Sequence, residues 1–233
     1  IRPMTFFNHV YAYELCIASS RLAKKYGSRI EEIDALIIEF VFNCHEYGEI
    51  RDEAETNLAL IRPEVEQLRS QSVSAAWWSA VAYSHALSCR WCHVVHPSRK
   101  SFQEFQNLLG VSGFEEAHML WLDVWSSWFL GNWTEMFEIT GRMLDDGLRR
   151  SDLFQLALLI GGFGRGAWLG RDRIDDVSQL QKRCNDFASD SNACNLFTVF
   201  DCLARIQECI YEQRFSEGWQ VYQQLNRQLR EFP

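Results

Sequence analysis

The sequence contains few of the residues that end helices and make tight turns. Four prolines and thirteen glycines among 233 residues leave little room for the turns that a protein of many short strands needs. Hydrophobic residues make up 47% of the chain and charged residues 23%, an ordinary balance for a folded protein. The composition therefore favours an all-α fold.

Long apolar segments and a basic surface are also missing. No apolar run approaches the roughly 18 residues of a membrane-spanning helix, and the start lacks the pattern of a signal peptide. A net charge of -8 argues against a surface built for phosphate backbones. We expect a cytoplasmic protein that binds neither membranes nor nucleic acid. Because the chain begins on Ile1 and stops at Pro233, just after a helical pattern, we also expect it to be part of a larger protein.

The cysteines fall within segments of helical periodicity. Small secreted proteins instead place paired cysteines in loop-rich frameworks. Since a buried free cysteine behaves as a small hydrophobic residue, we expect reduced and mostly buried thiols. The eight residues are Cys16, Cys44, Cys89, Cys92, Cys184, Cys194, Cys202 and Cys209.

Helix limits can be located from capping residues. The Ser-x-x-Glu spacing, in which the serine oxygen accepts a backbone N–H and the glutamate reaches back to the cap, occurs at 28–31, 101–104 and 112–115. Glycines, which permit the left-handed conformation that ends a helix, follow several periodic segments. Together these signals predict helices at 4–25, 29–47, 50–69, 72–96, 101–109, 114–130, 133–147, 152–169, 174–188, 192–212 and 215–230.

Four times, an apolar periodic segment runs into a short polar turn and then into a more charged periodic segment. The recurrence indicates stacked helical hairpins, which repeat every ~20 to 50 residues. We predict a single domain over 1–233, with an entry helix within 1–27 and a right-handed α-α solenoid of about five hairpins over 28–231. The predicted pairs are 29–47 with 50–69, 72–96 with 101–109, 114–130 with 133–147, 152–169 with 174–188, and 192–212 with 215–230.

The turns carry a family resemblance. The turn GNWTE at 131–135, with small residues at Gly218 and near Ala54 in second helices, resembles tetratricopeptide-like repeats, and more closely the longer, degenerate repeats of MalT-type regulators. The chain departs from the family at Met136, which occupies the small-residue position of the third hairpin, and in lacking the closing proline. The resemblance covers the chain from about residue 29. It implies a superhelix whose first helices line a concave binding surface.

Aromatic residues recur on the first helix of the third predicted hairpin. Trp121, Trp125 and Trp128 follow at i, i+4 and i+7, which places them on one face of a helix. Trp and Tyr often dominate binding, because they bury much area with few rotamers to freeze. The alternative is that the three residues form the core of the hairpin. Counting back from each turn predicts a partner-binding surface of Trp121, Trp125, Trp128, Trp168, Gln207 and Tyr211.

Residues 85–96 contain a possible ligand motif. Cys89-x-x-Cys92-His93 has the spacing of c-type haem attachment, and on a helix the cysteines would share one stripe with two further histidines. Eleven helical residues rise about 16 Å, so one straight helix cannot bring four such ligands to one ion. We therefore expect a buried seam with no metal and no cofactor, and haem or metal binding is the alternative.

The glycine-rich segment 161–166 lacks the order of a dinucleotide-binding loop or a P-loop. Gly162, Gly166 and Gly170 recur every fourth residue, so on a helix they form a strip that another backbone can approach. Each glycine costs a helix about 1 kcal/mol relative to alanine, so the run needs an explanation. Close packing is the prediction; a kink, a hinge or a ligand contact with bare backbone is the alternative.

No catalytic motif is present. The acidic pairs at 145–146 and 175–176 lack the third aspartate of D-D-x-x-D metal sites, and no nucleophile–base arrangement occurs. We predict a protein–protein interaction scaffold, not an enzyme, which binds a peptide or a partner domain for a larger regulatory protein. One alternative is a ligand-sensing domain, with its site near 161–166, that controls an ATPase, kinase or cyclase in the same chain. A second alternative is an all-helical enzyme or a haem or metal protein.

Overall fold

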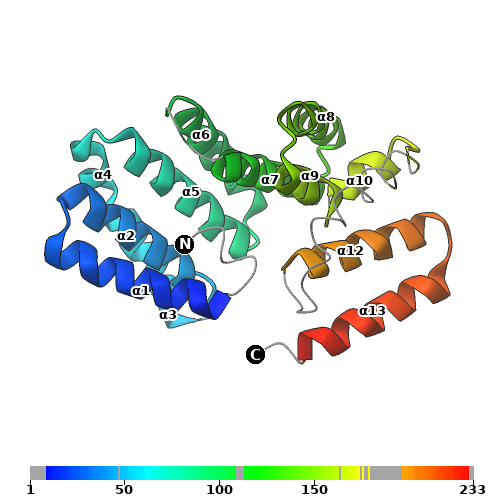
Figure 1. The fold of residues 1–233 in the computed structure, drawn as a ribbon, viewed down its shortest axis with the longest axis horizontal. Helices are drawn as coiled ribbons and strands as arrows, with labels where there is room; N and C mark the ends of the chain where they lie inside the picture. Colours follow the sequence, from blue (N-terminus) through cyan, green and yellow to red (C-terminus); the bar gives the residue numbers. More distant parts are fainter. Residues whose placement is uncertain are drawn as a thin grey trace. The chain divides into compact units, whose positions relative to one another are not determined.

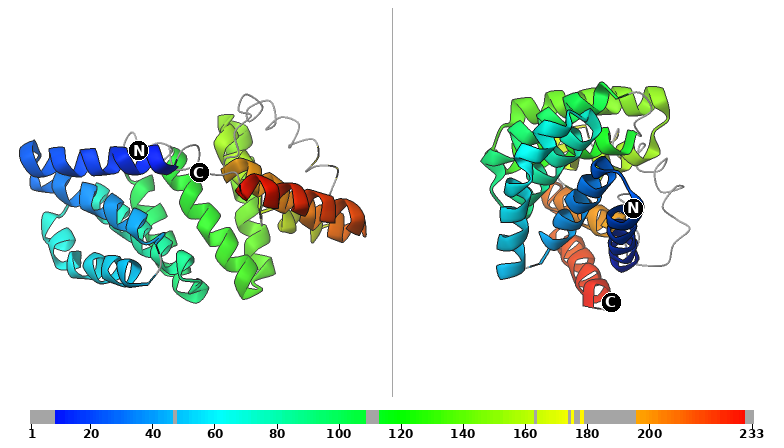
Figure 2. Two further views of the ribbon diagram at one scale, coloured as in Figure 1. Left: turned by 90° about the horizontal axis from the view of Figure 1, so that it is seen from below. Right: turned by 90° about the vertical axis from the view of Figure 1, so that its left-hand side faces the viewer.

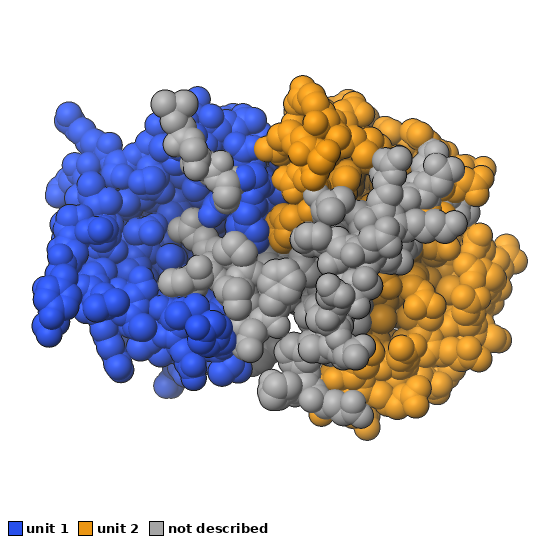
Figure 3. All heavy atoms as spheres, viewed as in Figure 1, with its two compact units in different colours: residues 1–126 blue, residues 127–233 orange. Residues whose placement is uncertain are grey.

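Helices dominate the part of the chain whose structure is described, and no strand occurs among those residues. The computed structural model describes residues 9–46, 48–108, 113–162, 164–173, 175, 178 and 196–230. For this part the all-α prediction is confirmed (Figure 1). The chain divides within one helix into two compact units, 1–126 and 127–233 (Figure 3). One continuous repeat domain over 1–233 stays a prediction, and each unit is described by itself.

Unit 1 is built from consecutive helices joined by short turns. α1 lies alongside α2, and α5 packs against both α2 and α6 (Figures 1 and 2). The core of α2, α3, α4 and α5 contains the buried residues Ile33, Ile37, Leu58, Val65, Val73, Ala76, Trp77 and Ala80. The elements are α1 (His9–Tyr26), α2 (Arg29–Asn43), α3 (Glu49–Leu60), α4 (Arg62–Leu68), α5 (Gln71–Leu87), the short 3-10 helix η2 (Trp91–His93), α6 (Val95–Gln106) and the first part of α7 (Gly113–Leu130).

The predicted capping box at the start of α2 is confirmed. The Ser28 side chain accepts the backbone N–H of Glu31, and the Ser28 N–H donates to Glu31 Oε2 at 2.7 Å. The Ser28 N–H and the Ser28 hydroxyl both donate to the Glu31 carboxylate and hold its pKa below its usual value. The local sequence therefore fixes where α2 begins.

The predicted helix over 50–69 is two helices. α3 ends at Leu60, and α4 begins at Arg62 with Pro63 in its first turn. Proline has no N–H, and its ring clashes with the carbonyl four residues earlier, so a continuous helix through Pro63 is disfavoured.

The predicted helix over 72–96 is wrong beyond Leu87. α5 ends there, Cys89 takes a left-handed φ of 54°, and η2 follows. The predicted start at Ser101 is also wrong, because Ser101 lies inside α6. Its hydroxyl is buried and donates to the carbonyl of Ala75 at 2.8 Å, a contact between helices that replaces a cap.

Unit 2 contains the end of α7 and five further described helices. α8 packs on α9, α10 contacts α8, α9 and α12, and α12 lies alongside α13 (Figures 1 and 2). The predicted helix over 152–169 is broken at Gly162, which has a φ of 53°; the predicted helix over 174–188 falls largely outside the described residues. The described ranges contain no helix long and apolar enough to cross a membrane. The elements are α8 (Trp133–Arg150), α9 (Leu153–Ile160), α10 (Gly164–Leu169), α12 (Leu196–Tyr211) and α13 (Phe215–Arg230).

Candidate functional site

Two of the predicted binding residues lie on the part of α7 that belongs to unit 1. Trp121 is 5% exposed and Trp125 is half-buried, with their ring centroids 4.3 Å apart. The Trp91 ring of η2 lies 6.5 Å from that of Trp125. On α6, Arg99 pairs with Asp123 at 2.9 Å and holds this part of α7 in place. Trp121 thus packs in the interior, and Trp125 lies at its edge.

The other four predicted residues belong to unit 2. Trp128 is half-buried and Trp168 is 4% exposed, with the Arg173 guanidinium 5.5 Å from the Trp168 ring. Gln207 is half-buried, and its Oε1 has no hydrogen-bond partner among the described residues. Tyr211 is 44% exposed, and its hydroxyl donates to Asp172 at 2.8 Å. Of these four, Tyr211 offers the most surface to a partner, and a binding role for the set stays a prediction.

The Cys89–His93 motif does not form the expected buried seam. Cys89 and Cys92 are both exposed, because the chain leaves the helix before it reaches them. Among the described residues, no group of three or more His, Cys, Asp and Glu side chains could hold a metal ion. The prediction of buried thiols holds for Cys16, Cys44, Cys202 and Cys209; Cys184 and Cys194 lie outside the described residues.

The glycine strip is used for packing. A Cβ on Gly166 would lie 1.9 Å from a ring carbon of Trp128, and one on Gly170 would lie 2.9 Å from the Phe137 ring. The chain also turns at Gly162, so the predicted packing and the alternative kink both occur. The space at Gly166 is filled by an indole of the same unit and offers no room for a ligand.

The hairpin of α12 and α13 is defined by its turn. Gln213 has a φ of 59°, the left-handed position that glycine occupies after other helices, and the Arg214 N–H donates to the Cys209 carbonyl at 2.7 Å. Gly218 allows close approach, since a Cβ there would lie 3.1 Å from the Cβ of Cys209. Cys202, Val221 and Leu225 form the buried core of the hairpin.

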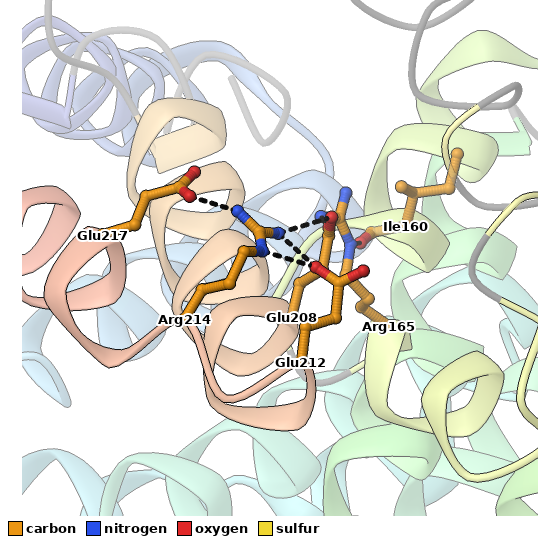
Figure 4. Close-up of polar contacts among 6 residues, drawn as sticks. All are labelled: Ile160, Arg165, Glu208, Glu212, Arg214 and Glu217. Carbon is orange, nitrogen blue, oxygen red and sulfur yellow. Dashed lines mark hydrogen bonds and ion pairs between the residues drawn. The ribbon is translucent and has the colours of Figure 1, made fainter.

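A network of charged side chains fixes this turn (Figure 4). Arg165 of α10 is 1% exposed, and its Nη1 lies 2.6 Å from Glu208 of α12. Burial lowers the pKa of Arg165 and the charge of Glu208 opposes that shift. Arg214 lies 3.5 Å from the same carboxylate and also pairs with Glu212 and Glu217. The network ties both helices of the hairpin to α10.

One face of α13 remains exposed. Phe215, Trp219 and Tyr222 recur at i, i+4 and i+7 and are 63%, 60% and 45% exposed. The Trp219 and Tyr222 rings stack with centroids 5.2 Å apart. Leu229, 46% exposed, continues the same face two turns on. We call these four residues the α13 stripe.

The predicted binding surface includes Tyr211 but none of the residues of the α13 stripe. The sequence signal lies in the two faces of this helix. Gly218, Val221 and Leu225 already supply the face that packs on α12, so the aromatic residues beside them are surplus to the core.

No family model, no curated protein and no solved structure matches the chain.

Proposed function

We propose that the chain is a protein–protein interaction module: a right-handed solenoid of tetratricopeptide-like hairpins that binds a helical segment of a partner protein. The observation that supports it is the α13 stripe, an aromatic face presented to solvent by a hairpin whose turn is fixed by ion pairs. Large exposed apolar surfaces on folded proteins commonly mark binding sites. The aromatic residues of the stripe lie one helical turn apart, a spacing that suits the apolar face of a partner helix.

Aromatic anchors on a fixed hairpin also lower the cost of binding, because few rotamers remain to be frozen. Trp219 is the expected centre of the interaction, since it lies between the other two aromatic residues of the stripe. Truncating a central tryptophan of an interface typically costs at least about 2 kcal/mol, which is roughly a 30-fold loss of affinity.

The proposal is tested by placing a photo-crosslinking residue at Gln223, an exposed residue one turn after Trp219, and capturing proteins from the source cells. We expect a crosslinked partner that is lost in Trp219→Ala and retained in Leu60→Ala, which truncates a 69% exposed side chain in unit 1. Capture that is unchanged by Trp219→Ala, or no capture by the wild type, would contradict the proposal. Circular dichroism of both variants checks that each remains folded.

A further inference from the structure

A pocket of about 370 Å³ opens on unit 1, where α3, α4 and α5 meet the turn after α5. This volume is at the small end of the range for sites that hold small organic ligands. Its wall is apolar: Leu58, Trp77 and Val81 line it. The Trp77 ring is held in place, because its Nε1 donates to the Leu58 carbonyl at 2.8 Å. The wall is therefore pre-formed.

The rim of the pocket carries an excess of positive charge. Arg62 and Arg90 both line it, against a single carboxylate, Glu55. Glu55 is committed elsewhere: Arg90 lies 2.6 Å from it, and Ser88 donates to it at 2.8 Å. Burial alone would raise the pKa of Glu55, but the hydrogen bonds from Ser88 and Arg90 lower it, so the carboxylate stays charged and paired. Arg62 is paired with no carboxylate of the lining, since its ion-pair partner, Glu66, lies outside the residues that line the pocket.

Arg62 is available to a ligand. Its guanidinium lies 5.5 Å from the Trp77 ring centroid, and it forms an ion pair with Glu66, an exposed residue of the same helix. Pairs of this kind between exposed side chains are weak and easily exchanged. Arginine binds carboxylates through two parallel N–H donors, so a ligand carboxylate can replace Glu66.

A polar side chain of α5 also lines the pocket. His85 lines it, and its Nδ1 is buried with no hydrogen-bond partner among the described residues. Burial and the nearby Arg90 charge lower the pKa of His85, so the ring is neutral near pH 7 and can donate or accept one hydrogen bond. His85 therefore adds a neutral polar side chain to the lining, and no further positive charge.

We propose that this pocket binds a small organic acid with a planar apolar body, the body against Trp77 and the carboxylate on Arg62. The inference is independent of the proposed function, because the pocket lies in unit 1 and the α13 stripe in unit 2. The end of α5 at Leu87 is what builds the site: the left-handed turn at Cys89 brings Arg90 back to Glu55.

Isothermal titration of the full chain with three probes of one shape tests the ligand chemistry. Indole-3-acetate should bind, the neutral indole-3-acetamide should bind at least 10-fold more weakly, and the cation tryptamine should not bind. Equal affinities for the acid and the amide, or no binding of the acid, would overturn the proposal. A far higher affinity for N-acetyl-Gly-Gly-Trp would also overturn it, since the carboxylate would then belong to a peptide end.

Two variants locate the site. Arg62→Met removes the charge, and Ala59→Phe fills the pocket from an exposed position, so neither disturbs the core. Each variant should lower the affinity for indole-3-acetate at least 10-fold. Arg142 is an exposed residue of α8, so Arg142→Met should leave the affinity unchanged. Unchanged affinity in both pocket variants would place the acid elsewhere and refute the assignment.

Discussion

The contact between Gly166 and Trp128 predicts that a single methyl group destabilises unit 2. In Gly166→Ala the new Cβ would lie 1.9 Å from Cζ3 of Trp128 and 2.8 Å from two further ring atoms. Overpacking of this severity falls at the upper end of the usual range, about 3 kcal/mol. Alanine recovers about 1 kcal/mol through its higher helix propensity. The net loss should be about 2 kcal/mol, which lowers the melting temperature by about 4 to 8 °C in a chain of this size.

The matched control is Gly141→Ala on α8. That glycine also lies within a helix, but a Cβ there meets nothing within 4 Å. The same substitution should therefore stabilise the chain by up to about 1 kcal/mol, through helix propensity alone. The chemical change is the same in both variants, so changes in unfolding free energy of opposite sign can only come from the surroundings of the two glycines.

Both variants are measured by urea and thermal unfolding, followed by circular dichroism. A third variant, Trp128→Leu, removes the ring that the methyl group would strike, so Gly166→Ala should cost much less in that background. The reasoning would be refuted if Gly166→Ala were as stable as the wild type, or if its cost were the same with and without the Trp128 ring.

Three further predictions follow from local geometry. Ser28→Ala should cost about 1 kcal/mol in urea unfolding, since it removes the cap of α2. Glu208→Ala should cost about 3 kcal/mol because it leaves the buried Arg165 charge without its closest partner, whereas Arg165→Met should cost clearly less; equal losses would contradict this ordering. In a background without the two cysteines outside the described residues, Cys89 and Cys92 should react with a thiol reagent in the folded protein, and the buried thiols only on unfolding.

The sequence predicts helix limits well where a side chain or a glycine makes the cap itself. Ser28 starts α2, Gly131 follows α7 with a φ of 73°, and Gln213 marks the turn before α13 by its place in the repeat. These signals depend only on neighbouring residues, so contacts with distant parts of the chain do not change them. Pro63 is an equally local signal, but the predicted helix over 50–69 runs through it and misses the break that separates α3 from α4.

The end of α5 carries no such local signal. The segment from Gln71 to His96 contains neither glycine nor proline, and Cys89 takes the left-handed conformation that side chains rarely adopt. Contacts distant in sequence hold the turn: Ser88 and Arg90 both reach Glu55 on α3. A pattern of neighbouring residues cannot contain that information, so the turn and the pocket beside it were missed together.

Periodicity also leaves open which aromatic face is buried. On α7 both faces carry apolar residues, and Trp121 and Val124 are both buried. The recurrence of tryptophan on one face of α7 therefore does not identify a binding surface. On α13 the buried residues occupy one face, and the α13 stripe extends the apolar arc past what α12 covers. A helix needs roughly 100° of apolar surface to pack on its own core. A helix whose apolar arc is wider than the neighbouring helices can cover leaves apolar residues for another molecule. Such an arc is a more specific sequence signal for an intermolecular surface than aromatic periodicity alone, and α13 has one.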